Sequence, residues 1–225
     1  MQPVTVATLV YKSPVWLSFC LEGLVYAKNR VPSRVLVVGN DATEEVKATG
    51  RLDLDFRNED PSEYYINRVY RAWCAAVEAA ETDLVVLVNS DHYPTDGWLD
   101  ALVEAKEAEP MSVPTSLQVE SGRIPSAMPE YARNFGTSPE TFDVEGFKRY
   151  ADTIRKPGVT EPGRLFMPCL FERDTFLRLG GYPHGNPTGT TGDKAFFARL
   201  AESGYRHVTA MGSVVAHIQE GEMRG

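Results

Sequence analysis

Short aliphatic runs alternate with helical apolar patterns along the first half of this chain, and this alternation restricts the fold more than any other feature. Three runs have the length and the β-branched content of buried strands: 4–10, 35–38 and 84–88. Apolar residues recur at helical spacing in three other segments: 16–25, 66–80 and 98–103. Strands that alternate with helices predict an α/β fold, in which a mostly parallel sheet is covered by helices on both faces.

The second half is less regular, because prolines repeatedly interrupt residues 108–164. We expect irregular structure there, with a strand at 111–117 and a short helix within 139–154. The patterns further along predict a strand at 165–171, a helical turn at 174–179, a helix from Asp193 to before Gly204, and an extended segment at 207–217. The spacing of Trp73, Phe196 and Phe197 is that of core residues.

Length and composition predict one folded domain, 1–225. The chain has 225 residues, of which 43% are hydrophobic, and this is enough to bury a sizeable core. A net charge of −8 without a lysine and arginine cluster disfavours generic binding to nucleic-acid backbones. The longest aliphatic runs are far shorter than the roughly twenty residues that span a bilayer, so we expect no transmembrane segment. Cys20, Cys74 and Cys169 lack metal-ligand spacing and indicate buried thiols in a cytoplasmic protein.

Polar residues follow each of the first three predicted strands, where ligands bind in open parallel sheets. They are Tyr11-Lys12, Gly39-Asn40-Asp41 and Asn89-Ser90-Asp91-His92. An aspartate directly after a buried strand can hold a divalent cation that neutralises a diphosphate, so Asp91 is a candidate metal ligand. The alternative is that Asp91 and Thr95 only cap the following helix, and the tetrapeptide alone leaves the two interpretations even.

Several segments together resemble one enzyme family, the family-2 glycosyltransferases with the GT-A fold. Asn89-Ser90-Asp91, directly after the run 84–88, resembles the Asp-x-Asp motif of this family. Segments 4–12 and 37–43 resemble its first nucleotide-binding strand and its Val-Asp-Asp-Gly-Ser segment. Four later features match in order: Gly180-Gly181-Tyr182, the block 192–200, Gly204-Tyr205 and the late histidine His217. Each motif alone is weak, but the order and spacing hold along most of the chain.

The resemblance implies a Rossmann-like GT-A domain that transfers a sugar from a nucleotide-diphosphate sugar. Residues 1–107 would bind the nucleotide sugar and residues 108–225 the acceptor. Mn²⁺ or Mg²⁺ would be held by Asp91 and His217, although a single histidine near a strand end is more often structural. The donor-binding residues implied are Thr8, Val10, Tyr11, Asn40, Asp41, Arg68, Asn89 and Ser90. For Arg68, a solvated surface position is the commoner case when the sequence is taken alone.

The chain departs from the family pattern at several positions. Asn89 stands where the first aspartate of the motif is usual, so a contact there would be made by a neutral amide. Residues 39–40 replace the aspartates that often contact the nucleotide base, which leaves the base preference open. Gly192 replaces a usual glutamate. His92 is an unusual addition to the motif, and we favour a phosphate donor or a surface residue over a metal ligand.

Asp193 is the candidate general base of an inverting transfer, in which the acceptor hydroxyl loses its proton as it attacks the sugar. It follows the glycine-rich segment 185–192, which we expect to be a mobile lid over bound donor. It also opens a helix, whose dipole favours an ionised carboxylate. Without the resemblance, a helix-start carboxylate that has no chemistry is the commoner case, and the resemblance reverses that preference.

Two other functions compete with sugar transfer. A non-catalytic nucleotide-sugar-binding module of the same fold would account for the departures at Asn89 and Gly192. A sugar nucleotidyltransferase would need a glycine-rich phosphate loop after the first strand, and residues 8–14 contain no glycine. The acceptor is open between a sugar, a lipid, a protein side chain and a modified nucleic-acid base, because acceptor contacts are expected in the irregular segment 108–164.

Overall fold

Nine strands form one sheet in residues 2–60, 62–122, 124–183 and 191–224, the parts of the chain that the computed structural model describes. The strands are β1 (Val4–Val10), β2 (Ser33–Asn40), β3 (Leu54–Phe56), β4 (Leu84–Asn89), β5 (His92–Pro94), β6 (Ser112–Ser121), β7 (Thr160–Pro162), β8 (Cys169–Glu172) and β9 (Arg206–Ile218). Their order across the sheet is β3-β2-β1-β4-β8-β6-β9-β5, and β7 pairs with the first half of β9.

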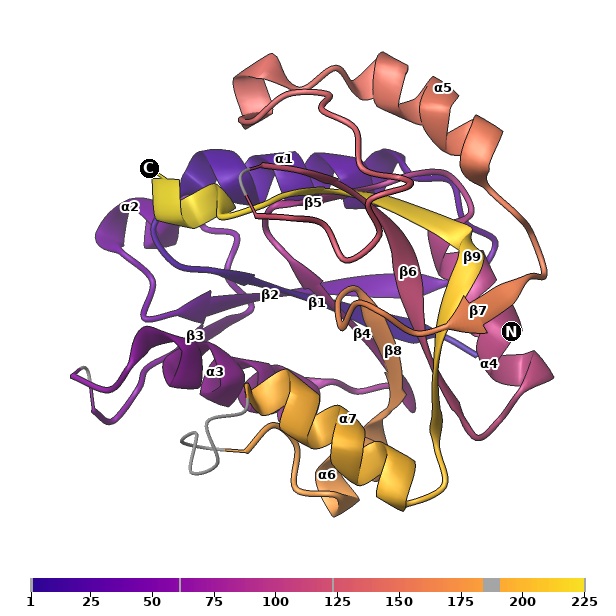
Figure 1. Ribbon diagram of the computed structural model, residues 1–225. Coiled ribbons are helices and arrows are strands. Elements are labelled where there is room, and N and C mark those ends of the chain that lie inside the picture. Colours follow the sequence, from indigo (N-terminus) through magenta and orange to yellow (C-terminus); the bar gives the residue numbers. More distant parts are fainter. Residues whose placement is uncertain (1, 61, 123, 184–190, 225) are drawn as a thin grey trace.

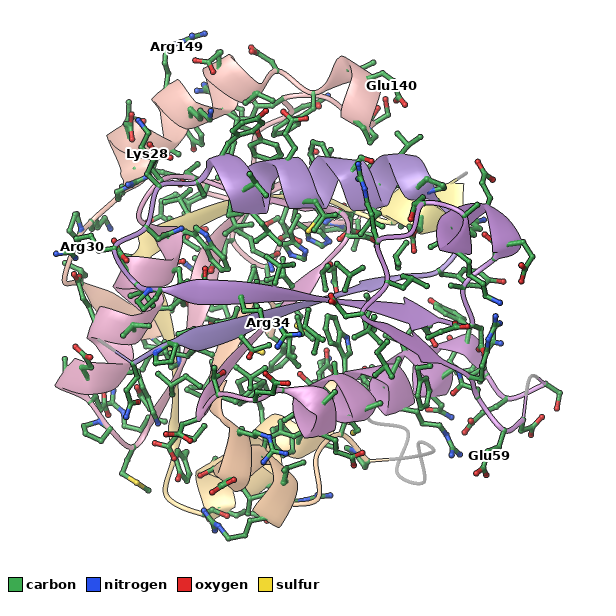
Figure 2. The ribbon with its side chains drawn as sticks, turned by 180° about the vertical axis from the view of Figure 1, so that it is seen from behind. Lys28, Arg30, Arg34, Glu59, Glu140 and Arg149 are labelled. Atoms are coloured by element: carbon green, nitrogen blue, oxygen red, sulfur yellow. The ribbon has the colours of Figure 1, made fainter. Side chains whose placement is uncertain are left out.

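Helices cover both faces of this sheet. They are α1 (Pro14–Tyr26), α2 (Glu44–Lys47), α3 (Tyr65–Ala79), α4 (Trp98–Ala108), α5 (Val144–Ile154), α6 (Arg173–Arg178) and α7 (Gly192–Glu202), with 3-10 turns η1 (Pro139–Thr141) and η2 (Gly221–Arg224). In Figure 1, α1 and α5 lie above the sheet, and α3, α6 and α7 lie below it. Figure 2 shows side chains filling the space between these layers, while charged residues such as Lys28 and Arg149 lie at the periphery.

The parallel part of the sheet sets the position of the site. Strand β1 consists entirely of buried residues and lies between β2 and β4, parallel to both. Val10 pairs with Gly39, and Leu9 pairs with Asn89, so the carboxyl ends of the three strands meet at one edge. Helix α1 follows β1 at once, because the Ser13 side chain caps its first turn.

The main core lies between the sheet and the lower helices. Trp73 of α3 and Phe196 of α7 are buried there, and Phe197 is 6% exposed, which confirms the predicted core positions. Fully burying one such aromatic side chain contributes about 1.5–3 kcal/mol to folding. A second group of apolar residues, including Phe147 of α5, packs between β6, β9 and the upper helices.

The predicted elements are largely confirmed, and the differences come from long-range pairing. The sequence shows residues 89–92 only as a polar run, but in the structure Asn89 ends β4 and His92 begins β5, which pairs antiparallel with β9. The helix expected from Thr95 therefore begins at Trp98. The strand expected at 165–171 covers only Cys169–Glu172. Strands β3 and β7 were not predicted, because three residues are too few to show a periodic pattern.

Two of the three cysteines are buried, as expected. Cys20 and Cys169 are buried free thiols, whereas Cys74 is partly exposed. Burial raises the pKa of the Cys20 thiol to about 12. None of the helices in the described part of the chain combines the length and hydropathy that a bilayer-spanning helix needs.

We expect the stability of the fold to decrease in mild acid because of His207. Burial lowers the pKa of this histidine to about 4, from a usual value of 6.5. Between these values the unfolded chain binds more protons than the folded one, so the stabilisation is complete above about pH 6.5 and is lost towards pH 4. The full loss is about 3 kcal/mol. His207→Gln should flatten this pH dependence in denaturant unfolding, and identical slopes for variant and wild type would contradict it.

Candidate functional site

A cavity of about 560 Å³ lies at the edge where β1, β2 and β4 end. Its volume is within the range of pockets that hold small organic ligands. Its wall is formed by Leu9, Val10, Tyr11, Asn40, Tyr65, Ile66, Arg68, Val69, Asn89, Ser90, Asp91, Glu220, Gly221 and Glu222. The wall therefore combines strand ends, the first turns of α3, and the segment that leads into η2.

The structure brings most of the predicted donor-binding residues together in this wall. They are Val10, Tyr11, Asn40, Arg68, Asn89 and Ser90, and they are joined by the candidate metal ligand Asp91. Thr8 lies apart from the wall: it is fully buried within β1, where its hydroxyl is 3.6 Å from the Cys20 thiol. Asp41 does not line the cavity, but its carboxylate contacts Arg68, which does.

The orientation of Arg68 depends on Asp41. Asp41 adopts a left-handed backbone conformation with φ of 51°. Its carboxylate accepts hydrogen bonds from the Asn58 side chain at 2.7 Å and from the Arg68 Nη1 at 3.1 Å. The Arg68 side chain is only 18% exposed, so the interpretation as a solvated surface residue is wrong. The buried Arg68 Nε has no hydrogen-bond partner, which leaves a donor for a ligand.

The segment before and within η2 forms one wall of the cavity and was not predicted from the sequence. Glu222 accepts hydrogen bonds from the backbone nitrogens of Tyr11 at 2.9 Å and Ser13 at 3.1 Å. Burial, reinforced by the negative charge of Asp91, outweighs these hydrogen bonds and raises the pKa of Glu222 to about 7. The sequence carries no signal for this contact, because it joins residues far apart in the chain.

Asp91, His92 and His217 form a compact group next to the cavity. Each offers one potential ligand atom, and the three atoms lie within 4.8 Å of one another. Asp91 Oδ2 is 3.7 Å from His217 Nε2, and Asp91 Oδ1 is 3.3 Å from His92 Nδ1. The two imidazole rings stack with centroids 4.6 Å apart and planes at 3°. His92 is fully buried, so of the two interpretations favoured from the sequence the surface residue is wrong.

Gln118 determines the tautomer of His92. The Gln118 Nε2 donates to the Met167 carbonyl and also lies 3.3 Å from His92 Nε2. If the side-chain nitrogen and oxygen of Gln118 were exchanged, the Gln118 oxygen would face the carbonyl oxygen of Met167, and two acceptors would oppose each other. The nitrogen therefore occupies this position, and the same nitrogen faces His92. Because an amide nitrogen only donates, His92 Nε2 accepts, and the ring proton lies on Nδ1, facing Asp91. Asp91 and His217 are therefore better placed than His92 to ligate a cation.

The charges in this group support that assignment. Burial alone would raise the pKa of Asp91, but His217 and the hydrogen bond from His92 lower it below its usual value. Burial alone would lower the pKa of His217, but the carboxylates of Asp91 and Glu120 raise it. Burial and the charge of His217 lower the pKa of His92, which keeps this ring neutral.

The donor set fits a divalent transition metal. Two ligand atoms 3.7 Å apart, Asp91 Oδ2 and His217 Nε2, can contact one ion, since each metal–ligand distance is about 2 Å. One carboxylate oxygen and one imidazole nitrogen suit Mn²⁺ better than Mg²⁺, which takes oxygen ligands.

Asp193 lies in the first turn of α7, outside the described residues that line the cavity. Its Oδ1 accepts a hydrogen bond of 2.7 Å from the backbone nitrogen of Lys194. The Tyr70 hydroxyl lies beside it, and burial, together with the Asp193 charge, raises the pKa of Tyr70 to about 12. Gly192 packs on Tyr70 so closely that a Cβ would lie 2.6 Å from the ring. Of the predicted lid at 185–192, residues 185–190 lie outside the described residues.

Comparison with known proteins gives structural neighbours only. No protein-family model matches the sequence, and no curated protein resembles it closely enough to count as a match. A mannosyltransferase from Pyrobaculum calidifontis, solved with GDP-Man and Mn²⁺, superposes with a TM-score of 0.64 at 19% identity over 96% of this chain. GalNAc-T7, solved with UDP, GalNAc and Mn²⁺, superposes with a TM-score of 0.64 at 14% identity over 96%.

A third neighbour, S. aureus TarS 1-349, has a TM-score of 0.60 at 16% identity over 98% of this chain. The chain covers 56%, 43% and 61% of the length of these three proteins, in the order given. At such identities the likeness concerns the arrangement of the backbone. Together with the sheet order, it shows that this chain has the GT-A fold of glycosyltransferases.

Proposed function

We propose that this chain is a glycosyltransferase that uses a nucleotide-diphosphate sugar and Mn²⁺. The observation that carries the proposal is the cavity at the ends of β1, β2 and β4, because its wall includes Asp91 and His217 Nε2 lies 3.7 Å from that carboxylate. A site for a nucleotide and a site for a cation thus share one residue. Mg²⁺ is the second candidate ion, and the imidazole nitrogen makes it the weaker one.

The wall supplies complementary surfaces for such a donor. Val10, Ile66 and Val69 offer apolar area to the base and ribose, and the 42% exposed Tyr65 adds an aromatic ring. Arg68, held by Asp41, offers its free Nε–H to an anionic or carbonyl oxygen. A bound cation on Asp91 and His217 would neutralise the diphosphate as it leaves.

In this proposal Asp193 is the general base of an inverting transfer. It lies in the first turn of helix α7. The Tyr70 hydroxyl and the packing of Gly192 fix the start of that helix. In this role Asp193 accepts the proton of the acceptor hydroxyl, whether the acceptor is a sugar, a lipid, a protein side chain or a modified nucleic-acid base.

Screening nucleotide sugars for protection against thermal unfolding tests the proposal. A donor at one hundred times its Kd stabilises the folded state by about 2.7 kcal/mol. For a chain of this size that raises Tm by about 5–10 °C. We expect a shift of this order with one or a few nucleotide sugars in the presence of Mn²⁺, and a much smaller shift when a chelator is added.

Two controls separate the alternatives. The matching nucleoside monophosphate lacks the diphosphate, so Mn²⁺ should add little to its effect. Slow hydrolysis of the protecting donor would favour an enzyme, whereas protection without any hydrolysis or transfer would favour a non-catalytic binding module. If no nucleotide sugar raises Tm in a Mn²⁺-dependent way, the proposed function is wrong.

A further inference from the structure

Three neighbouring strands place three side chains in one row across the sheet. Strand β9 lies between β6 and β5. In this register His217 is opposite Glu120 of β6 on one side and His92 of β5 on the other. Directly opposite residues present their side chains on the same face of a sheet. The imidazole of His217 is therefore flanked by a carboxylate and by a second ring.

Glu120 is a buried carboxylate whose hydrogen-bond partners are all donors. It is 8% exposed. Its Oε1 accepts from His217 Nδ1 at 3.2 Å and from Gln219 Nε2 at 3.3 Å, and its Oε2 accepts from the Ser126 hydroxyl. Burial alone would raise the pKa of Glu120, but the hydrogen bonds from His217 and Ser126 lower it to about 2. Glu120 is therefore ionised at neutral pH.

The two nitrogens of His217 face two different carboxylates. Nδ1 lies 3.2 Å from Glu120, and Nε2 lies 3.7 Å from Asp91. A neutral imidazole has one N–H, and Glu120 is the nearer acceptor, so that hydrogen lies on Nδ1. Nε2 is then left with a lone pair directed towards Asp91. The ring cannot easily turn away, because His92 stacks on it at 4.6 Å.

We infer that Glu120 is a positioning residue of the metal site, which holds the Nδ1 hydrogen of His217 so that Nε2 is free to bind the cation together with Asp91. The inference rests on the proposed function, because it presupposes that a divalent cation binds at Asp91. A carboxylate that accepts the second N–H of a ligating histidine fixes the tautomer and increases the basicity of the ligand. Without Glu120, the ring hydrogen would move to Nε2, where the Asp91 carboxylate can accept it, and Nε2 would be blocked.

A purely structural role predicts a different outcome. Glu120 also joins β6 to residues 126 and 219, so its loss can lower stability without any effect on a metal. Two variants separate these roles. Glu120→Gln keeps an oxygen that can accept from His217 Nδ1 but removes the charge, whereas Glu120→Leu removes the acceptor.

The experiment is a Mn²⁺ titration of the full chain without nucleotide, followed by the electron paramagnetic resonance signal of free Mn²⁺. Glu120→Leu should bind Mn²⁺ about 10–100-fold more weakly than wild type, and Glu120→Gln should lie in between. Glu172→Gln is the matched control, because Glu172 accepts hydrogen bonds from Thr175 and pairs with Lys106 away from the site. It should bind Mn²⁺ as wild type does.

The second readout is the ¹⁵N NMR spectrum of metal-free protein at alkaline pH, where His217 is neutral. Wild type and Glu120→Gln should carry the hydrogen on Nδ1, and Glu120→Leu should shift it towards Nε2. If Glu120→Leu does not fold, Glu120→Gln carries the test through its Mn²⁺ affinity. If wild type binds Mn²⁺ and the folded Glu120 variants bind it equally well, the inference is overturned while the proposed function stands. If wild type binds no Mn²⁺ in this titration, the inference fails, and the proposed function is decided separately by the Mn²⁺-dependent rise in Tm with nucleotide sugars.

Discussion

Asp193→Asn is expected to lower the rate of sugar transfer by roughly 100- to 10,000-fold while leaving donor affinity unchanged. A positioned general base contributes a factor of this size, equal to about 3–5 kcal/mol of barrier. Asparagine keeps the shape of the side chain, and its oxygen can still accept from the Lys194 backbone nitrogen. It cannot accept a proton from the acceptor hydroxyl. The measurement is turnover of the donor found by thermal screening, with its affinity measured separately.

Asp174→Asn is the matched control, since Asp174 is also an acidic residue in the first turn of a helix, α6, and its side chain is 97% exposed. It should leave turnover unchanged. Near-normal turnover in Asp193→Asn would show that Asp193 is only a helix-start carboxylate. The search for the base would then move to other residues.

Asp91→Asn is expected to remove the effect of Mn²⁺ on donor binding, by roughly 100-fold in affinity or about 3 kcal/mol. The change replaces an ionised ligand by a neutral amide of the same size. The fold should persist, because Asp91 lies at a strand end with its side chain still 15% exposed. Donor affinity measured by titration calorimetry, with Mn²⁺ and with chelator, gives the difference directly.

Asp100→Asn separates loss of metal from loss of stability. Asp100 is similarly buried, with an 11% exposed side chain, but it binds the backbone nitrogens of Arg30 and Val31. This variant should lower Tm and leave the Mn²⁺ dependence intact. An Asp91→Asn protein that keeps a normal response to Mn²⁺ would remove Asp91 from the metal site.

The sequence was most informative where structure is decided by neighbouring residues. The strands around Val6, Val37 and Val86 could be predicted because all three runs are rich in aliphatic and β-branched residues and are buried on both faces. The position of Asp91 followed from the third run, since a residue directly after a buried parallel strand must lie at the carboxyl edge of the sheet. For the same local reason, Asn40 was assigned to this edge.

Features that depend on distant pairing could not be predicted in this way. His92 is polar and follows a polar tripeptide, so a loop was the natural expectation, and only pairing with β9 buries it. Glu120 lies in a strand whose ten residues are all buried, without an alternating pattern that would mark a functional side chain. Glu222 reaches the backbone of Tyr11 across the site, and no periodicity connects the two.

The insertion of β9 between β6 and β5 has a consequence for the order of folding. Glu120 and His217 are 97 positions apart, so the loop between them must close before the two strands can pair. Contacts between such distant residues form slowly. Asp91 and His217 are even further apart, and they meet only when β5, β6 and β9 are all in place. An unfolded or half-folded chain therefore has no preformed high-affinity metal site, and Mn²⁺ should slow global unfolding rather than guide the first steps of folding.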